Sequence, residues 1–160
     1  MNAKDAIKIS IDMGQKITLD YLKDLTDKEL LHRPAKGANH INWQLGHLIE
    51  SENQMGNMAV PGSMPPLPAG FAEKYTKDTA TSDDASKFLK KDELLKLFEE
   101  QRVATRKALD KSSEADLDKP TGQSWAPTVA SLFSMAGTHW VMHAGQWAVV
   151  RRQLGRPPLF

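Results

Sequence analysis

The chain has 160 residues, enough for one domain with a single sizeable core, and its 40% hydrophobic and 26% charged side chains are ordinary for a globular protein. Its 21 basic and 20 acidic residues leave a net charge of +1, and no basic stripe alternates with aromatic residues, which argues against a nucleic-acid partner. The chain has no cysteine, so disulfides, thiolate metal ligands and a cysteine nucleophile are excluded.

The N-terminal residues do not have the pattern of an export signal. Lys4, Asp5 and Lys8 interrupt the apolar residues there, which argues against a signal peptide. No uninterrupted apolar run in the chain approaches the length of a membrane span. We therefore expect a cytoplasmic protein with no membrane partner, folded as a single domain over residues 1–160.

Residues 2–25 carry the apolar spacing of an amphipathic helix. Gly14 lies on the apolar face, where it costs the helix about 1 kcal/mol relative to alanine, and it therefore indicates close packing. The run from Thr26 to Glu29 is a capping box that predicts a short helix, closed by Pro34. The residues expected on the apolar face of the first helix are Ile7, Ile11, Gly14, Thr18, Tyr21 and Leu25, widened by Ile9, Met13 and Ile17.

A second helix is predicted over residues 41–59, ending before Pro61. Its inward stripe is expected to contain Trp43, Gln44, His47, Leu48 and Ser51. Residues 61–90 then lack periodicity, because a proline-rich run is followed by one rich in threonine, serine and aspartate. A connection of this length is typical of a functional lid or a mobile crossover, and an unstructured surface loop is the alternative.

The third and fourth helices are predicted over residues 92–111 and 128–154. The inward positions of the third are Leu94, Leu97, Phe98, Gln101, Ala104, Thr105 and Ala108. Those of the fourth are Leu132, Ala136, His139, Trp140, His143, Trp147, Val150 and Leu154. With no convincing strand pattern, these elements predict an all-α four-helix bundle, and the long crossover between the second and third helices allows topologies other than simple up-and-down.

Three histidines occupy the middle of two of these apolar faces. His139 and His143 are four residues apart, so they point to the same side of the fourth helix, and His47 lies midway along the second. Three neutral imidazoles with an open fourth position are typical of a catalytic zinc site, and nickel and other divalent ions accept the same ligands. The alternative is that these histidines are polar residues accommodated on a tight core face, since an HxxxH spacing also arises by chance.

The other two histidines are not expected to bind metal. His32 lies beside Arg33 at the end of the short helix and is interpreted as a surface residue. His40 precedes His47 by about two helical turns, or ~10 Å, so it is interpreted as a capping or packing residue. An HExxH metalloprotease motif is absent, because Trp140 follows His139.

Polar residues near the three histidines give no clear general base, so the catalytic residues stay unassigned. Glu50 and Glu52 flank the stripe of the second helix and are interpreted as solvated surface residues. Asn53, Gln101 and Gln146 are candidates for hydrogen bonds that orient the metal ligands or a substrate. Trp43 and Trp140 are expected in the core, close enough to the ligands to wall a pocket.

The chain resembles the DinB-like (YfiT-type) family of metal-binding helical bundles. The resemblance rests on three runs and covers essentially the whole chain: Asn42-Trp43-Gln44-Leu45-Gly46-His47-Leu48, then His139-x-x-x-His143-Ala144-Gly145-Gln146, then Arg151-Arg152-x-Leu154-Gly155-x-Pro157-Pro158. It implies an up-down-down-up bundle, often dimeric, in which a divalent metal is held by three histidines. Carried over position by position, these ligands are His47, His139 and His143.

The resemblance also implies two kinds of activity. Some members of the family resemble S-transferases that use a low-molecular-weight thiol, and others look like metal-dependent hydrolases acting on small molecules. We therefore expect either a metal-dependent transferase or hydrolase with zinc or nickel, or, as the alternative, a non-catalytic helical bundle with or without metal. We also expect a homodimer, and a crossover that packs beside the metal pocket or the subunit interface and restricts access.

Overall fold

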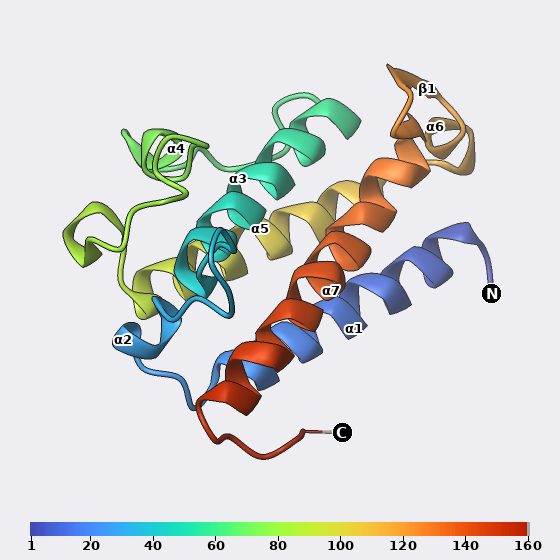
Figure 1. Cartoon of the computed structure of the whole chain (residues 1–160). Helices are drawn as coiled ribbons and strands as arrows, with labels where there is room; N and C mark the ends of the chain where they lie inside the picture. The colour runs from blue at the N-terminus through green and yellow to red at the C-terminus, as the bar shows by residue number, and fades with distance from the viewer. Residues whose placement is uncertain (160) are drawn as a thin grey trace.

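The computed structural model describes residues 1–159, and most of them lie in four long helices (Figure 1). These are α1 (Ala3–Leu22), α3 (Ile41–Ala59), α5 (Lys91–Lys111) and α7 (Val129–Gln153). Shorter elements are α2 (Asp27–Leu30), α4 (Phe71–Lys74), the 3₁₀ turn η1 (Ala85–Lys87), α6 (Glu114–Leu117), and the strands β1 (Pro120–Gln123) and β2 (Ala126–Thr128). The predominantly helical fold is as predicted. No helix among the described residues is both long and apolar enough to cross a membrane.

The helices begin at residues that satisfy their free N–H groups. The side chain of Asn2 accepts a hydrogen bond from the amide of Asp5 at 2.9 Å and so caps α1. The predicted capping box is present, since Thr26 and Glu29 bond each other's amides at the start of α2. The first helix ends at Leu22, short of the predicted residue 25, because the chain already turns before this capping box.

Helices α1 and α7 lie side by side, and two glycines let them approach closely (Figure 1). A Cβ atom on Gly14 would lie 2.8 Å from the carbonyl oxygen of Gly137, and one on Gly137 would lie 2.4 Å from that of Ser10. Both distances are too short for a side chain, so the close packing predicted from Gly14 is confirmed. Ile9 and Met13 do not widen the buried face of α1 as predicted, because they are 54% and 57% exposed and no other element of the described chain covers them.

Helix α3 packs against both α5 and α7, and the main core lies between them. The largest side chains of this core come from all four long helices, the short helices and the crossover. They include Leu22, Leu48, Ile49, Phe71, Tyr75, Phe98, Trp140 and Trp147. Because α3 is buried on two sides, most residues from Ile41 to Gly56 are removed from solvent, whereas His47 keeps partial exposure.

The crossover between α3 and α5 follows a defined path along α3. Tyr75 packs so closely on Gly46 that a Cβ atom there would lie 2.2 Å from its ring. The indole nitrogen of Trp43 donates to the carbonyl oxygen of Thr76 at 3.0 Å. Arg33 anchors the later part by donating to the carbonyl oxygen of Ser82 at 2.9 Å. The crossover is therefore not an unstructured loop, and it packs beside the segment of α3 that carries His47.

A short antiparallel hairpin precedes α7, although the sequence showed no convincing strand pattern. Gly122 has φ of +76° in this hairpin, a conformation that side-chain-bearing residues rarely adopt. Trp125 lies between the two strands and is 52% exposed, whereas Ala126 is fully buried. Thr128 follows and caps α7 through its side chain, so the hairpin determines where the last helix starts.

Candidate metal centre

The structure brings the three predicted histidines together between α3 and α7. His47, His139 and His143 each offer one nitrogen, and these three nitrogens lie within 4.8 Å of one another. The ring centroid of His47 lies 5.4 Å from that of His139 and 5.7 Å from that of His143, and the last two are 5.0 Å apart. Within residues 1–159 no carboxylate joins this group.

Gln44 fixes the orientation and the tautomer of His143. Its Nε2 donates to the carbonyl oxygen of Asn39 at 2.7 Å, so its Oε1 faces the opposite way. That oxygen accepts from Trp147 Nε1 at 2.8 Å and meets His143 Nδ1 at 2.9 Å. An amide oxygen can only accept, so Nδ1 of His143 carries the proton and the lone pair of its Nε2 is free for a metal ion. A hydrogen bond of this kind on the nitrogen opposite the metal is the usual support for a histidine ligand.

The other two histidines are held mainly by packing. The ring of His47 stacks on that of Trp43, with centroids 5.3 Å apart and an angle of 7° between the planes. Nδ1 of His139 is buried without a hydrogen-bond partner among the described residues. A buried polar atom without a partner is costly, so this imidazole suits a ligand supplied from outside the chain.

The surroundings keep these imidazoles neutral near pH 7. Burial, together with the neighbouring imidazoles, lowers the pKa of His139 and of His143 to about 4. Burial also lowers the pKa of His47. A metal ion binds the neutral form, so each ring offers a lone pair without first losing a proton. All three side chains remain partly exposed, which leaves the group open to solvent on one side.

The donor set fits one class of metal ion. Three imidazole nitrogens suit zinc, nickel, copper and iron, whereas calcium and magnesium prefer carboxylate and carbonyl oxygens. The neutral rings, the fixed tautomer of His143 and the unpartnered nitrogen of His139 all agree with such a site.

The remaining histidines lie outside this group, as the sequence predicts. His40 is fully buried and caps α3, because its Nδ1 accepts from the amide of Trp43 at 3.0 Å and its Nε2 meets the carbonyl oxygen of Ser82 at 3.1 Å. His32 Nε2 meets Oε1 of Gln153 at 2.9 Å on the outer side of the molecule.

Glu52 is not the solvated surface residue that the sequence suggested. It is 1% exposed and lies 3.1 Å from Arg102 Nη2, which is buried to the same degree. Thr105 donates to one of its oxygens at 2.8 Å, and Trp140 Nε1 donates to the other at 2.9 Å. This network ties α3, α5 and α7 together behind the histidines, and burial raises the pKa of Glu52 against the pull of Arg102. Trp140 therefore lies in the core, as predicted.

The polar residues near the site have roles different from those first considered. Asn53 and Gln101 both donate to the carbonyl oxygen of Pro65, so they hold the crossover and not a metal ligand. Gln146 is exposed and reaches His143 only through Gln44, whose Nε2 lies 3.2 Å from its Oε1. The sequence predicts Gln44 on the inward stripe but indicates no role for it. Its position, three residues before His47 on a buried face, was the available signal.

Three imidazoles grouped between two helices of a mostly helical chain fit a metal-binding protein. The sequence model of the DinB superfamily matches residues 10–147, so the chain belongs to that superfamily. The match contains all three histidines and the hairpin. No curated protein matches the chain.

Proposed function

We propose that the protein is a metal-dependent enzyme that acts on a small molecule as a thiol S-transferase or a hydrolase. The observation that carries the proposal is the convergence of three neutral imidazoles, one of which has its tautomer set by Gln44. His47, His139 and His143 are the proposed ligands, and zinc or nickel is the proposed ion.

A divalent ion bound there would lower the pKa of a water or a low-molecular-weight thiol and so supply a nucleophile near neutral pH. The histidines would hold the ion without adding charge, because burial favours their neutral forms. By holding Nδ1 of His143, Gln44 leaves Nε2 as the nitrogen that would bind the ion. Trp43 covers one face of His47 and limits the directions from which water and substrate arrive. Among residues 1–159 no carboxylate lies in the group, so no residue is assigned as general base.

The up-down-down-up order of the four long helices is part of the same proposal. Contacts along α1 and α7 rise together in sequence, from Ser10 with Gly137 to Asp24 with Arg151. Contacts along α3 and α5 also rise together, whereas those between α3 and α7 run in opposite order. These directions support two parallel pairs, α1 with α7 and α3 with α5, and the long crossover lets the consecutive helices α3 and α5 run parallel, as the courses of the helices in Figure 1 do.

We further propose a twofold homodimer. The exposed apolar side chains of Ile9 and Met13 on α1 give such a contact a candidate surface. Light scattering at micromolar concentration should give about twice the 17.8 kDa of one chain. A mass of 17.8 kDa under these conditions would rule the dimer out.

Metal analysis of the purified protein tests the proposal first. Zinc or nickel should be present at one ion per chain, and His143→Ala should lose it while keeping its helical content, because the apolar faces supply most of the core. His32→Ala is the matched control and should retain the ion. Thiol consumption with an aromatic electrophile, and hydrolysis of aryl esters, should then depend on the ion and stop with chelator. A protein that takes up no divalent ion would instead be a non-catalytic helical bundle.

A further inference from the structure

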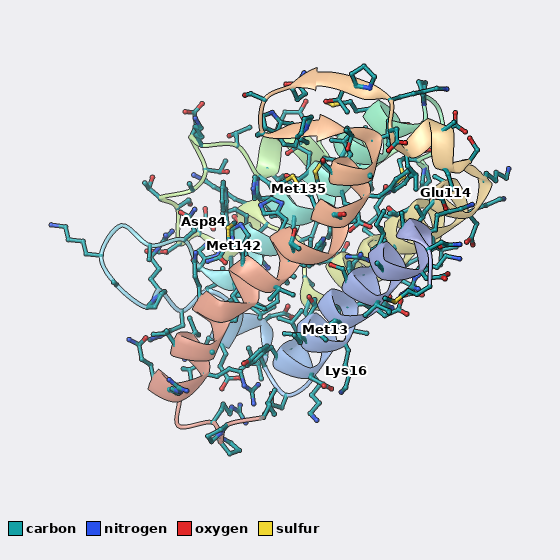
Figure 2. All side chains as sticks on the ribbon, turned by 90° about the vertical axis from the view of Figure 1, so that its right-hand side faces the viewer. Met13, Lys16, Asp84, Glu114, Met135 and Met142 are labelled. Carbon is teal, nitrogen blue, oxygen red and sulfur yellow. The ribbon has the colours of Figure 1, made fainter. Side chains whose placement is uncertain are left out.

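A cavity of about 210 Å³ opens beside the histidine group. Its walls come from α3, α7 and the hairpin, so it is built by the same two helices that carry the histidines. They include His139, Met55, Met58, Met135 and Trp125. Figure 2 shows Met135 on α7 near the hairpin, whereas Met13 and Lys16 lie on α1, farther from the hairpin. No residue of the crossover lines this cavity, so the hairpin covers this side of the site.

The cavity lies next to the histidine group along helices α3 and α7. Helices α3 and α7 run in opposite directions, since Gln44 bonds Trp147 whereas the later residue Glu52 bonds the earlier residue Trp140. Ser51 comes one turn after His47 on α3, and Met135 comes one turn before His139 on α7. Both steps therefore lead the same way, so the cavity extends from His139, which lines it, by about one helical turn (roughly 6 Å) towards the hairpin.

The lining of the cavity is apolar and polarisable. Three thioethers and one indole provide most of it, and none of the lining residues is an acid, a lysine or an arginine. Ser51 and Gln54 supply the only neutral polar side chains besides His139. Thioether sulfur makes favourable contacts with aromatic rings, and the flexible methionine side chain adapts to their shape. Trp125 and Met58 are 52% and 42% exposed, so apolar surface is left uncovered at the mouth of the cavity.

The size of the cavity limits what it can hold. An apolar cavity of about 150 Å³ accommodates benzene. A space of about 210 Å³ therefore takes one aromatic ring with one or two small substituents. It is smaller than the roughly 300 Å³ at which pockets for drug-sized ligands begin, so part of a larger molecule would extend out of its mouth.

We propose that this cavity binds a small, uncharged aromatic molecule, whose ring lies between the methionines and Trp125 and whose polar substituent points to His139. The ligand is the substrate, or the apolar part of it, for the reaction proposed above, and its role as substrate rests on that proposed function. Binding of the ring itself requires no metal, because the cavity is made of the side chains of this chain alone.

The NMR signals of the methionine methyl groups report directly on binding of an aromatic ring in the cavity. The chain has seven methionines, and protein labelled with ¹³C at the methionine methyl groups can be titrated with benzyl alcohol. The methyl signals of Met55, Met58 and Met135 should move by ring-current shifts and saturate together. Those of Met13 and Met142, which are 57% and 59% exposed and lie outside the cavity, should stay unchanged. Equal shifts at all five, or no shift at the cavity methionines, would overturn the proposal.

A non-aromatic ligand and a matched pair of variants sharpen the test. Cyclohexylmethanol carries the same hydroxymethyl group on a saturated ring and should bind more weakly, because it lacks the flat aromatic ring that thioether sulfur contacts favourably. Met58→Gln should raise the Kd for benzyl alcohol roughly twofold to tenfold, and Met142→Gln, also an exposed methionine on a helix, should leave it unchanged. Met58 is partly exposed, so its replacement leaves the fold intact. An unchanged Kd in Met58→Gln would contradict the assigned position of the ring.

The same samples separate this proposal from the proposed function. If zinc binds but benzyl alcohol does not perturb the cavity methionines, the cavity assignment fails and the metal site stands. If benzyl alcohol binds in the cavity of a protein that takes up no zinc or nickel, the ligand class stands and the metal-dependent reaction is refuted.

Discussion

Replacing Gln44 tests whether this side chain organises the metal site. Gln44 is 1% exposed, and its Oε1 serves two partners, His143 Nδ1 at 2.9 Å and Trp147 Nε1 at 2.8 Å. Leucine fills a similar volume but accepts neither bond. We expect Gln44→Leu to weaken zinc binding about 10-fold to 100-fold, because His143 loses the acceptor that fixes its tautomer. The fold should lose about 1–3 kcal/mol, because the buried indole N–H keeps no partner.

Competition with a chromophoric zinc chelator measures the affinity, and thermal unfolding measures the fold. A loss of 1–3 kcal/mol corresponds to a Tm lower by roughly 2–12 °C for a chain of this length. Gln44→Glu keeps an acceptor for both partners and should recover most of the affinity, although it loses the bond to Asn39. Gln146→Leu is the control, since Gln146 touches only the far side of Gln44. Zinc binding by Gln44→Leu at parental affinity, or an equal loss in Gln146→Leu, would refute the reasoning.

Three further predictions follow from other parts of the structure. Arg102→Met leaves a buried carboxylate without its partner and should cost about 3–5 kcal/mol in urea unfolding, whereas Arg106→Met, which breaks a solvent-exposed pair one turn away, should cost no more than about 1 kcal/mol. An equal loss of unfolding free energy in the two variants would show that burial of the Glu52–Arg102 pair does not raise the cost of breaking it. Gly137→Ala should destabilise by about 1–3 kcal/mol, because its Cβ would press on α1, whereas Gly145→Ala, which meets nothing within 4 Å, should stabilise by about 0.5–1 kcal/mol. Stabilisation of both variants would contradict the close helix contact. Zinc affinity should stay nearly constant from pH 7 to about 6 and fall as the pH approaches 4. Burial lowers the pKa of the ligand imidazoles, so protons compete with zinc for them only in acid. A loss of zinc affinity with its midpoint near the ordinary histidine pKa of about 6.5 would contradict this prediction.

The long helices could be predicted because local chemistry defines them. The bounds predicted for the second helix, about residue 41 to residue 59, agree with α3, since turn-forming residues precede Ile41 and Pro61 comes two residues after Ala59. The two histidines of α7 had to be neighbours, because a spacing of four places side chains on successive turns. That His47 faces them depends on which helices pack together, and there the family resemblance supplied what periodicity alone does not.

The features that the sequence did not reveal depend on partners far along the chain. From periodicity alone a charged residue is expected to face solvent, so the sequence predicts Glu52 on the surface. In the structure Glu52 is instead paired with Arg102 and accepts a hydrogen bond from Trp140. The hairpin strands of four and three residues are too short for an alternating pattern, and Gly122 was their only local signal. Ile9 fits the apolar spacing of α1, yet more than half of it stays exposed against residues 1–159.

The central claim is that three histidines hold one ion, and an anomalous-difference map of crystals grown with one equivalent of zinc tests it most directly. The account predicts one strong peak per chain between α3 and α7, about 2.0–2.1 Å from a nitrogen of each of His47, His139 and His143. The nitrogen of His143 should be Nε2, with Nδ1 still bonded to Gln44. A peak at His32 or His40 instead, or one that leaves any of the three histidines out of reach, would contradict it.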